Sequence, residues 1–147
     1  MIAEFNSEGN LPAGVHWANW QEIVDRFGST PQRRVLLEGL RDACRSLRNA
    51  GCRTVYIDGS FVTAKPVPGD FDACWEVSDV DPALLDPVLL VFDRGRAAQK
   101  ARFGGELFPA QLPNGITGLT FLEFFQIDKV TGNPKGIVAL DLRNLSP

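Results

Sequence analysis

The sequence is poor in the residues that build disulfide frameworks and zinc sites. Its 147 residues include three cysteines, Cys44, Cys52 and Cys74, at unrelated spacings, and a single histidine, His16. An odd number of cysteines argues against a set of disulfides and suits a reducing compartment, and one histidine leaves a zinc site short of ligands. Nothing in the sequence supplies the orienting partner that His16 would need as a general base.

Long apolar runs and an excess of charge are also missing. No stretch approaches the roughly 18 apolar residues of a membrane-spanning helix, and the first residues lack the basic start and apolar core of a signal peptide. We therefore expect a cytoplasmic protein without membrane contact. The formal net charge of −3 gives no global basic field that would attract nucleic acid. A hydrophobic content of 44% over 147 residues fits one domain with a substantial core.

Hydrophobic periodicity and turn residues predict both helices and strands. Helix starts are indicated at Asn19, where Glu22 can complete a capping box, and at Thr30, which precedes Pro31. The predicted strands are 53–58, 71–77, 119–128 and 135–142, after an irregular segment over 4–15. We therefore predict one domain with an α+β fold, a mixed twisted β-sheet flanked by helices. Residues 1–30 would form an N-terminal arm with a short helix, and residues 31–147 the core.

Two short motifs, separated by nine residues, are the most informative part of the sequence. The apolar run Val55-Tyr56-Ile57 leads into Gly59-Ser60, and Asp70-Phe71-Asp72 begins the next apolar run. Glycine has no Cβ, so phosphates can approach the main chain closely at Gly59. The Ser60 hydroxyl adds a donor, and free N–H groups after it would favour an anion.

Asp70 and Asp72 stand two residues apart at the start of a predicted strand, so their side chains point to the same face. Two carboxylates so close repel each other unless a cation joins them. Mg²⁺ suits this pair, because it binds one or two carboxylates and completes its octahedron with substrate phosphates and water. The competing interpretation is structural, with a hairpin-like turn at Gly59 and a solvated turn at Pro68-Gly69-Asp70.

Together the two motifs resemble the signature of the DNA polymerase beta-like nucleotidyltransferase superfamily. Asp58, which precedes the glycine, departs from that signature. The resemblance implies a nucleotidyltransferase-like fold and transfer of a nucleoside monophosphate from a nucleoside triphosphate (NTP) such as ATP to a hydroxyl of a protein or RNA acceptor. It also implies Mg²⁺ as cofactor, with one or two ions bound by Asp70 and Asp72. Gly59 and Ser60 would hold the β- and γ-phosphates.

Nucleotidyltransferases of this type carry a third carboxylate on a later strand. Glu123 is our candidate, because it is embedded among Phe and Leu residues of the predicted strand 119–128, where an unpaired acid is costly. There it would bind a metal or take the proton of the attacking hydroxyl. Asp128 is the rival, although Asp128 to Asn133 has the composition of a hairpin turn. Lys65 is placed to reach nucleotide phosphates, and an exposed surface lysine is the alternative.

Further segments support a wider resemblance. They are Asn10-Leu11-Pro12, His16-Trp17, Asn49-Ala50-Gly51-Cys52, Gly59-Ser60-Phe61-Val62, Gly104-Gly105-Glu106-Leu107-Phe108-Pro109, Phe124-Phe125-Gln126 and Lys135-Gly136-Ile137-Val138. Over nearly its full length the chain is similar to a family of small bacterial nucleotidyltransferase-like proteins. Transferases of the wider superfamily often occur in toxin–antitoxin or phage-defence pairs, which implies such a setting here.

The small size of the chain leads us to expect that a partner or a second copy, as in a homodimer, contributes the acceptor-binding surface. A basic segment, 94–102, is a candidate for triphosphate or acceptor contacts. The alternative to an enzyme is a catalytically degenerate, antitoxin-like protein that keeps the fold and binds a partner. Its interaction face would be Trp17 and Trp20 or the arginine row of the second helix.

Overall fold

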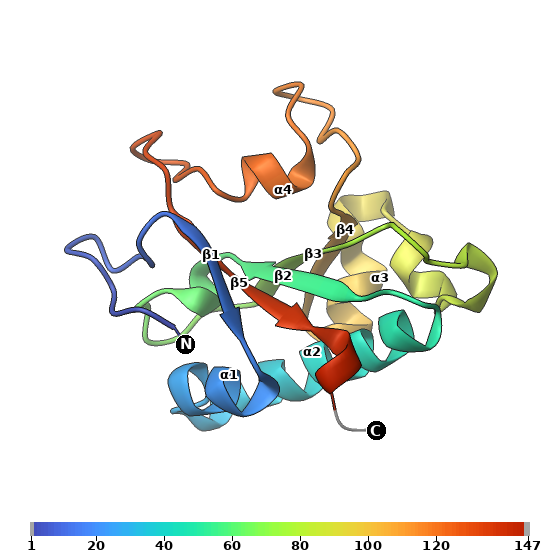
Figure 1. Cartoon of the computed structure of the whole chain (residues 1–147), viewed down its shortest axis with the longest axis horizontal. Helices are drawn as coiled ribbons and strands as arrows, with labels where there is room; N and C mark the ends of the chain where they lie inside the picture. Colours follow the sequence, from blue (N-terminus) through green and yellow to red (C-terminus); the bar gives the residue numbers. More distant parts are fainter. Residues whose placement is uncertain (1, 146–147) are drawn as a thin grey trace.

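Five strands form one mixed sheet in the order β1-β5-β2-β3-β4 (Figure 1). The strands are β1 (Gly14–Ala18), β2 (Thr54–Asp58), β3 (Phe71–Trp75), β4 (Gly105–Pro109) and β5 (Gly136–Asp141). The pairs β1–β5 and β3–β4 are parallel, whereas β2 runs antiparallel to β5 and β3. This computed structural model describes residues 2–145, so the ends of the predicted domain, residues 1 and 146–147, lie outside the described part. The predicted single α+β domain with a mixed sheet is confirmed.

Two helices begin at the caps that the sequence predicted. The α-helices within residues 2–145 are α1 (Trp20–Phe27), α2 (Pro31–Asn49), α3 (Asp93–Phe103) and α4 (Phe121–Phe124). Asn19 and Glu22 form a complete capping box at α1, and the Thr30 side chain accepts the Arg33 N–H at the start of α2. None of these helices is long and apolar enough to cross a bilayer.

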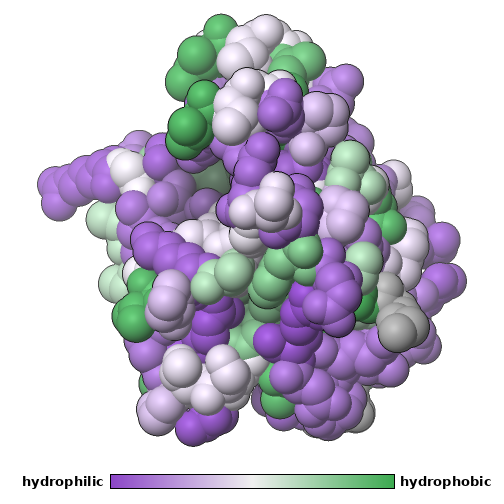
Figure 2. Space-filling view, turned by 90° about the vertical axis from the view of Figure 1, so that its left-hand side faces the viewer, coloured by the Kyte–Doolittle hydropathy of each residue, from purple (hydrophilic) through white to green (hydrophobic). Residues whose placement is uncertain are grey.

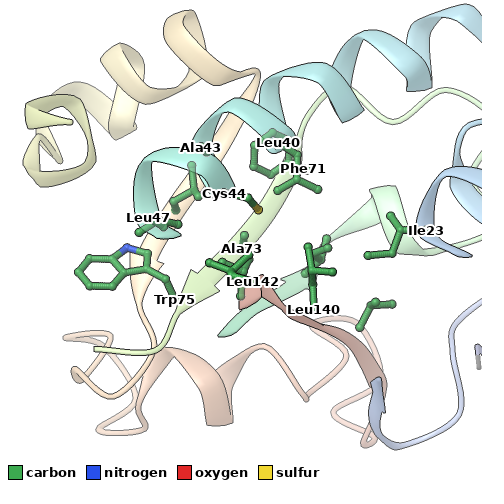
Figure 3. Packing of buried hydrophobic residues seen from close by; sticks show 14 of the residues in the cluster. Ile23, Leu40, Ala43, Cys44, Leu47, Phe71, Ala73, Trp75, Leu140 and Leu142 are labelled. Carbon is green, nitrogen blue, oxygen red and sulfur yellow. The ribbon is translucent and has the colours of Figure 1, made fainter. Parts of the chain in front are cut away.

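Helices α1 and α2 cover one face of the sheet (Figure 1). Figure 3 shows Leu40, Ala43, Cys44 and Leu47 of α2 close to Phe71, Ala73 and Trp75 of β3, all of them buried. The helical residues recur every three or four positions and the strand residues every second position, so one stripe of the helix meets one face of the sheet. Burial of this apolar surface is the main stabilising contribution to the fold.

The opposite face of the sheet has a smaller apolar cover. Helix α4 and its neighbouring loops lie on that side (Figure 1). The buried members of this second cluster are Cys74, Ala110, Phe125 and Ile137, and partly buried aromatic residues surround them. Because the cover is incomplete, strand residues near the starts of β3 and β4 can carry polar side chains that reach solvent.

Arg33 ties α2 to the loop that follows β2. Its guanidinium is buried, which lowers its pKa, and it donates hydrogen bonds to the backbone carbonyls of Phe27, Phe61, Thr63 and Lys65. The planar, multiply donating guanidinium can satisfy several carbonyls at once. Arg33 therefore fixes the shape of the Gly59–Lys65 loop from within the fold.

The predicted strand over 119–128 is wrong. Thr120 caps the short helix α4 instead, and Glu123 closes a capping box with it. The apolar run has the composition of a strand, but a hydroxyl followed three residues later by Glu is a helix-start signal. The aromatic residues of this segment pack down onto the sheet rather than pairing within it.

Two strands are absent from the sequence prediction. The prediction treats residues 4–15 as irregular, yet Gly14 already belongs to β1, and β4 lies outside all four predicted strands. Each is an edge strand of five residues that pairs with a single neighbour in the sheet. Short edge strands carry weak local patterns, because a distant partner strand selects them.

Candidate functional site

Three carboxylates lie side by side on neighbouring strands. In the sheet register Asp58 of β2 is opposite Asp72 of β3, and Asp72 is opposite Glu106 of β4. Register partners project to the same side of a sheet, so these side chains share the face that α4 partly covers. Asp70 immediately precedes β3 and adds a fourth acid two residues from Asp72.

Asp70, Asp72 and Glu106 form a group that we call the acidic trio. One carboxylate oxygen from each lies within 4.8 Å of the others, and all three residues are partly exposed. Carboxylate oxygens are the protein ligands that Mg²⁺ prefers, and partial exposure leaves room for water and phosphate in its coordination shell. Among the described residues the trio is the one group of three or more His, Cys, Asp or Glu side chains that could hold a metal.

Asp72 is the member of the trio most strongly perturbed by its surroundings. Burial and the nearby negative charges of Asp70, Glu106 and Asp58 raise the pKa of Asp72 to about 7, against a smaller lowering by Lys129. A carboxylate crowded by like charges holds its proton until a cation compensates the repulsion. The donor set therefore fits a divalent cation, whose charge would relieve this repulsion.

Gly59 lies directly against Asp72. Its φ is +79°, and a Cβ built at this position would stand 2.6 Å from Asp72 Oδ2. Any other residue would thus clash with the trio and strain the backbone. Beside it, Ser60 begins a short 3₁₀ helix of one turn, Ser60–Val62. The predicted neighbourhood of the Gly-Ser turn and the paired aspartates is present in the structure.

Two cations from α3 already contact Glu106. Arg96 Nε lies 2.9 Å from Oε2 and Lys100 Nζ lies 3.1 Å from Oε1. Arg96 belongs to a left-handed stretch of backbone over Arg94, Gly95 and Arg96, where φ is between +54° and +64°. The basic segment that the sequence singled out therefore does reach the site, through these two side chains.

Asp58, the residue that departs from the superfamily signature, has a defined partner. It is buried, and its Oδ1 lies 3.2 Å from Nζ of Lys135, the residue before β5. Burial raises the pKa of Asp58, while the charge of Lys135 lowers it. An ion pair of this kind compensates a carboxylate that would otherwise be buried alone.

Glu123 and Asp128 have structural partners away from the trio. The Glu123 carboxylate accepts hydrogen bonds from the Thr120 N–H and hydroxyl in the capping box, which lowers its pKa. Asp128 accepts from Val130 and Thr131 N–H and from Asn10 Nδ2, which confirms the turn interpretation. The structure does not bring Glu123 into the group of carboxylates, and Glu106 takes that place.

Lys65 is exposed, and it does not line either of the two pockets that flank the trio.

Glu106 is absent from the predicted site, although the local pattern could have revealed it. In Gly105-Glu106-Leu107-Phe108-Pro109 the buried Leu107 alternates with two partly exposed neighbours, which is a short strand pattern. The sequence could not show that this strand pairs beside Asp72.

Two pockets flank the trio and meet at Asp72, Phe125 and Lys129. The aromatic pocket, about 460 Å³, is lined by Asp70, Asp72, Arg96, Glu106, Phe108, Asn114, Ile116, Phe121, Phe124, Phe125 and Lys129. The Gly-Ser pocket, about 230 Å³, is lined by Asp58, Gly59, Ser60, Thr63, Asp72, Phe125, Asp128, Lys129 and Lys135. The second pocket combines three aspartates with two lysines and two hydroxyls, and the lysines and hydroxyls are groups that bind phosphate oxygens.

A family model covers almost the whole chain. Residues 3–141 match the family of unknown function DUF6932, so the chain belongs to that family. None of the curated proteins matches the chain, and none of the solved structures does.

Proposed function

We propose that this protein is a metal-dependent nucleotidyltransferase that moves a nucleoside monophosphate from an NTP to a hydroxyl group, on a nucleotidyltransferase-type fold. The observation that carries the proposal is the position of the acidic trio beside Gly59 and Ser60. One carboxylate oxygen from each of Asp70, Asp72 and Glu106 lies within 4.8 Å of the others, and Asp72 Oδ2 occupies the space that a Cβ at Gly59 would need. In this proposal the turn that binds phosphate lies directly beside the site that binds the cation.

In this mechanism the chain's own residues orient the reactants. The Gly-Ser pocket would hold the β- and γ-phosphates through Ser60, Thr63, Lys129 and Lys135. Mg²⁺ held by the trio would stabilise negative charge on the α-phosphate and on the leaving oxygen. The acceptor oxygen forms a bond to the α-phosphorus, while the bond from that phosphorus to the bridging oxygen breaks. Pyrophosphate leaves with the bonding electrons, and a carboxylate of the trio accepts the hydroxyl proton.

One observation favours a second candidate. Both oxygens of Glu106 are engaged by Arg96 and Lys100, and Asp58 is engaged by Lys135. An acidic cluster compensated by the protein's own cations can be purely structural. The second candidate is accordingly a catalytically degenerate, antitoxin-like protein that binds a partner and no nucleotide.

Calorimetric titration separates the two candidates. ATP, CTP, GTP and UTP are titrated into wild type with and without Mg²⁺, and into Asp70→Asn/Asp72→Asn, whose fold is checked by circular dichroism. We expect magnesium-dependent binding of at least one NTP that the double variant loses. Glu123→Gln is the matched control, because glutamine keeps the capping box and the residue lies outside the trio. Absence of NTP binding by folded wild type would favour the degenerate candidate.

A further inference from the structure

The aromatic pocket has a wall that the transfer chemistry does not need. Its lining includes four rings, Phe108 of β4 and Phe121, Phe124 and Phe125 at α4, and we call these four residues the aromatic wall. The acidic trio lines the same pocket. A pocket lined by both charged groups and several rings fits a ligand that has a charged part and a flat aromatic part.

The rings of the wall form a continuous set. Phe108 and Phe121 are stacked with centroids 4.4 Å apart and an interplanar angle of 15°, and Phe125 meets both edge-on. Arg96 lies over Phe108 at 5.4 Å and Lys129 over Phe124 at 5.9 Å. Cations placed over rings are attracted by the π-face, so the wall has a charged group at each end.

The loop between β4 and α4 forms part of the pocket lining, through Asn114 and Ile116. The Asn114 side chain accepts hydrogen bonds from the Ile116 and Thr117 N–H groups, and Pro113 and Thr120 form a β-bridge at the base of the loop. Ile116 lines the pocket although it is 92% exposed. Figure 2 shows apolar surface at the top of the molecule, the end at which this loop stands in Figure 1. The loop is thus tied at its base and presents an apolar side chain at the rim.

We propose that the aromatic pocket binds the base of the NTP, a planar heteroaromatic ring that stacks on the aromatic wall. This inference rests on the proposed function and adds where the nucleoside lies. The aromatic and Gly-Ser pockets share Asp72, Phe125 and Lys129, so a ligand that spans them passes Asp72 of the trio. A nucleotide meets this requirement, because it carries phosphates at one end and a planar heteroaromatic base at the other.

The size and chemistry of the pocket agree with this occupant. A volume of about 460 Å³ lies within the range of small-molecule sites. Stacking on aromatic side chains is tolerant of base identity, because every base has a π-face. Loss of one stacking ring is therefore expected to weaken nucleotide binding about tenfold, while phosphate contacts in the Gly-Ser pocket stay unchanged.

The test compares a nucleotide with its phosphate tail alone. Mn²⁺ complexes of inorganic tripolyphosphate and of ATP, CTP, GTP and UTP are titrated into wild type, Phe121→Leu and Phe124→Leu. Leucine keeps the apolar volume of the wall but removes the ring, and two variants guard against a local packing defect in either. Phe5→Leu is the matched control, because Phe5 is partly buried against Phe27 and does not line the aromatic pocket.

We expect wild type to bind at least one NTP about tenfold or more tighter than tripolyphosphate. Phe121→Leu or Phe124→Leu should lose this preference for the NTP over tripolyphosphate while still binding tripolyphosphate as wild type does. Phe5→Leu should retain the preference. Equal affinity of wild type for tripolyphosphate and every NTP would overturn the base-binding proposal and leave the proposed function standing. If neither ligand binds, both proposals fail.

Discussion

Asp72 on β3 and Glu106 on β4 are register partners in a parallel pair, so their carboxylates project side by side from one face of the sheet. Asp70 joins them from the residue before β3, and Gly59 lies against Asp72. The acidic trio is therefore built by strand pairing. Its properties give a set of measurable expectations.

Removal of the Glu106 charge should weaken metal binding. We expect Glu106→Gln to lower Mn²⁺ affinity at least about tenfold, because changes even to outer-shell partners of a metal site cost this much. Electron paramagnetic resonance of free Mn²⁺ measures the affinity directly. Glu123→Gln should bind Mn²⁺ as wild type does, since Glu123 caps α4 instead. Equal loss in both variants would mean that the trio is wrongly assigned.

Metal-free protein should lose stability as the pH rises through about 7, because of Asp72. Its pKa in the folded protein is raised to about 7, so the native state holds a proton that the unfolded chain releases near pH 4. This contribution is fully present below pH 4 and is lost as the pH increases to 7. Asp72→Asn has no carboxyl to titrate at this position, so its free energy of unfolding should not show this loss. Relative to wild type, we expect the free energy of unfolding of Asp72→Asn to be about 2 kcal/mol more favourable to folding at pH 8 than at pH 5.

Urea denaturation in EDTA at pH 5 and pH 8 checks this expectation. The charged groups that act on Asp72 are Asp70, Glu106, Asp58 and Lys129. Added Mn²⁺ should stabilise wild type at pH 8 and should have less effect on Asp72→Asn. A difference between the two proteins that does not change with pH would contradict the raised pKa.

The cations on Glu106 should oppose metal binding. Arg96 and Lys100 each lie about 3 Å from a Glu106 oxygen, and their positive charges repel a divalent ion placed at the trio. We expect Arg96→Ala/Lys100→Ala to raise the affinity for Mn²⁺ alone severalfold, with an effect that decreases at high salt. Arg102→Ala is the control, because Arg102 pairs with Asp86 instead. Unchanged or weaker Mn²⁺ binding in the double variant would oppose this account.

A methyl group at Gly59 should disturb the site. We expect Gly59→Ala to lower stability by about 1–3 kcal/mol, because φ is +79° there and the new Cβ would meet Asp72 Oδ2. Metal affinity should fall with it. Gly69→Ala is the matched control, since a Cβ added at Gly69 would meet nothing within 4 Å and its φ is not strained. Thermal denaturation and Mn²⁺ titration of both variants test the expectation.

Arg33 should be the arginine of α2 that matters most to folding. Arg33→Lys removes most of the hydrogen bonds to the carbonyls of Phe61, Thr63 and Lys65, and we expect a loss of about 3 kcal/mol or more. Arg34→Lys, one position along the helix, should change stability little, because the Arg34 contact to Gly28 is exposed. Similar stability of the two variants in urea would contradict the assignment.

The sequence by itself determined the local features of the site. The apolar run before Gly59, the paired aspartates two residues apart, and the caps at Asn19 and Thr30 all lie within short windows of residues. Such features depend on backbone sterics and on hydrogen bonds between near neighbours, so they need no distant contact to form. For the same reason the turn at Asp128 could be predicted.

Only the tertiary structure decided which acid completes the trio. Glu123 and Glu106 both stand among apolar residues, but Thr120 captures the first in a capping box, whereas pairing of β4 with β3 places the second beside Asp72. Strand pairing depends on partners far away in the chain, and the short β4 has little local signal of its own. The aromatic pocket and the buried Arg33 are likewise products of packing between distant segments.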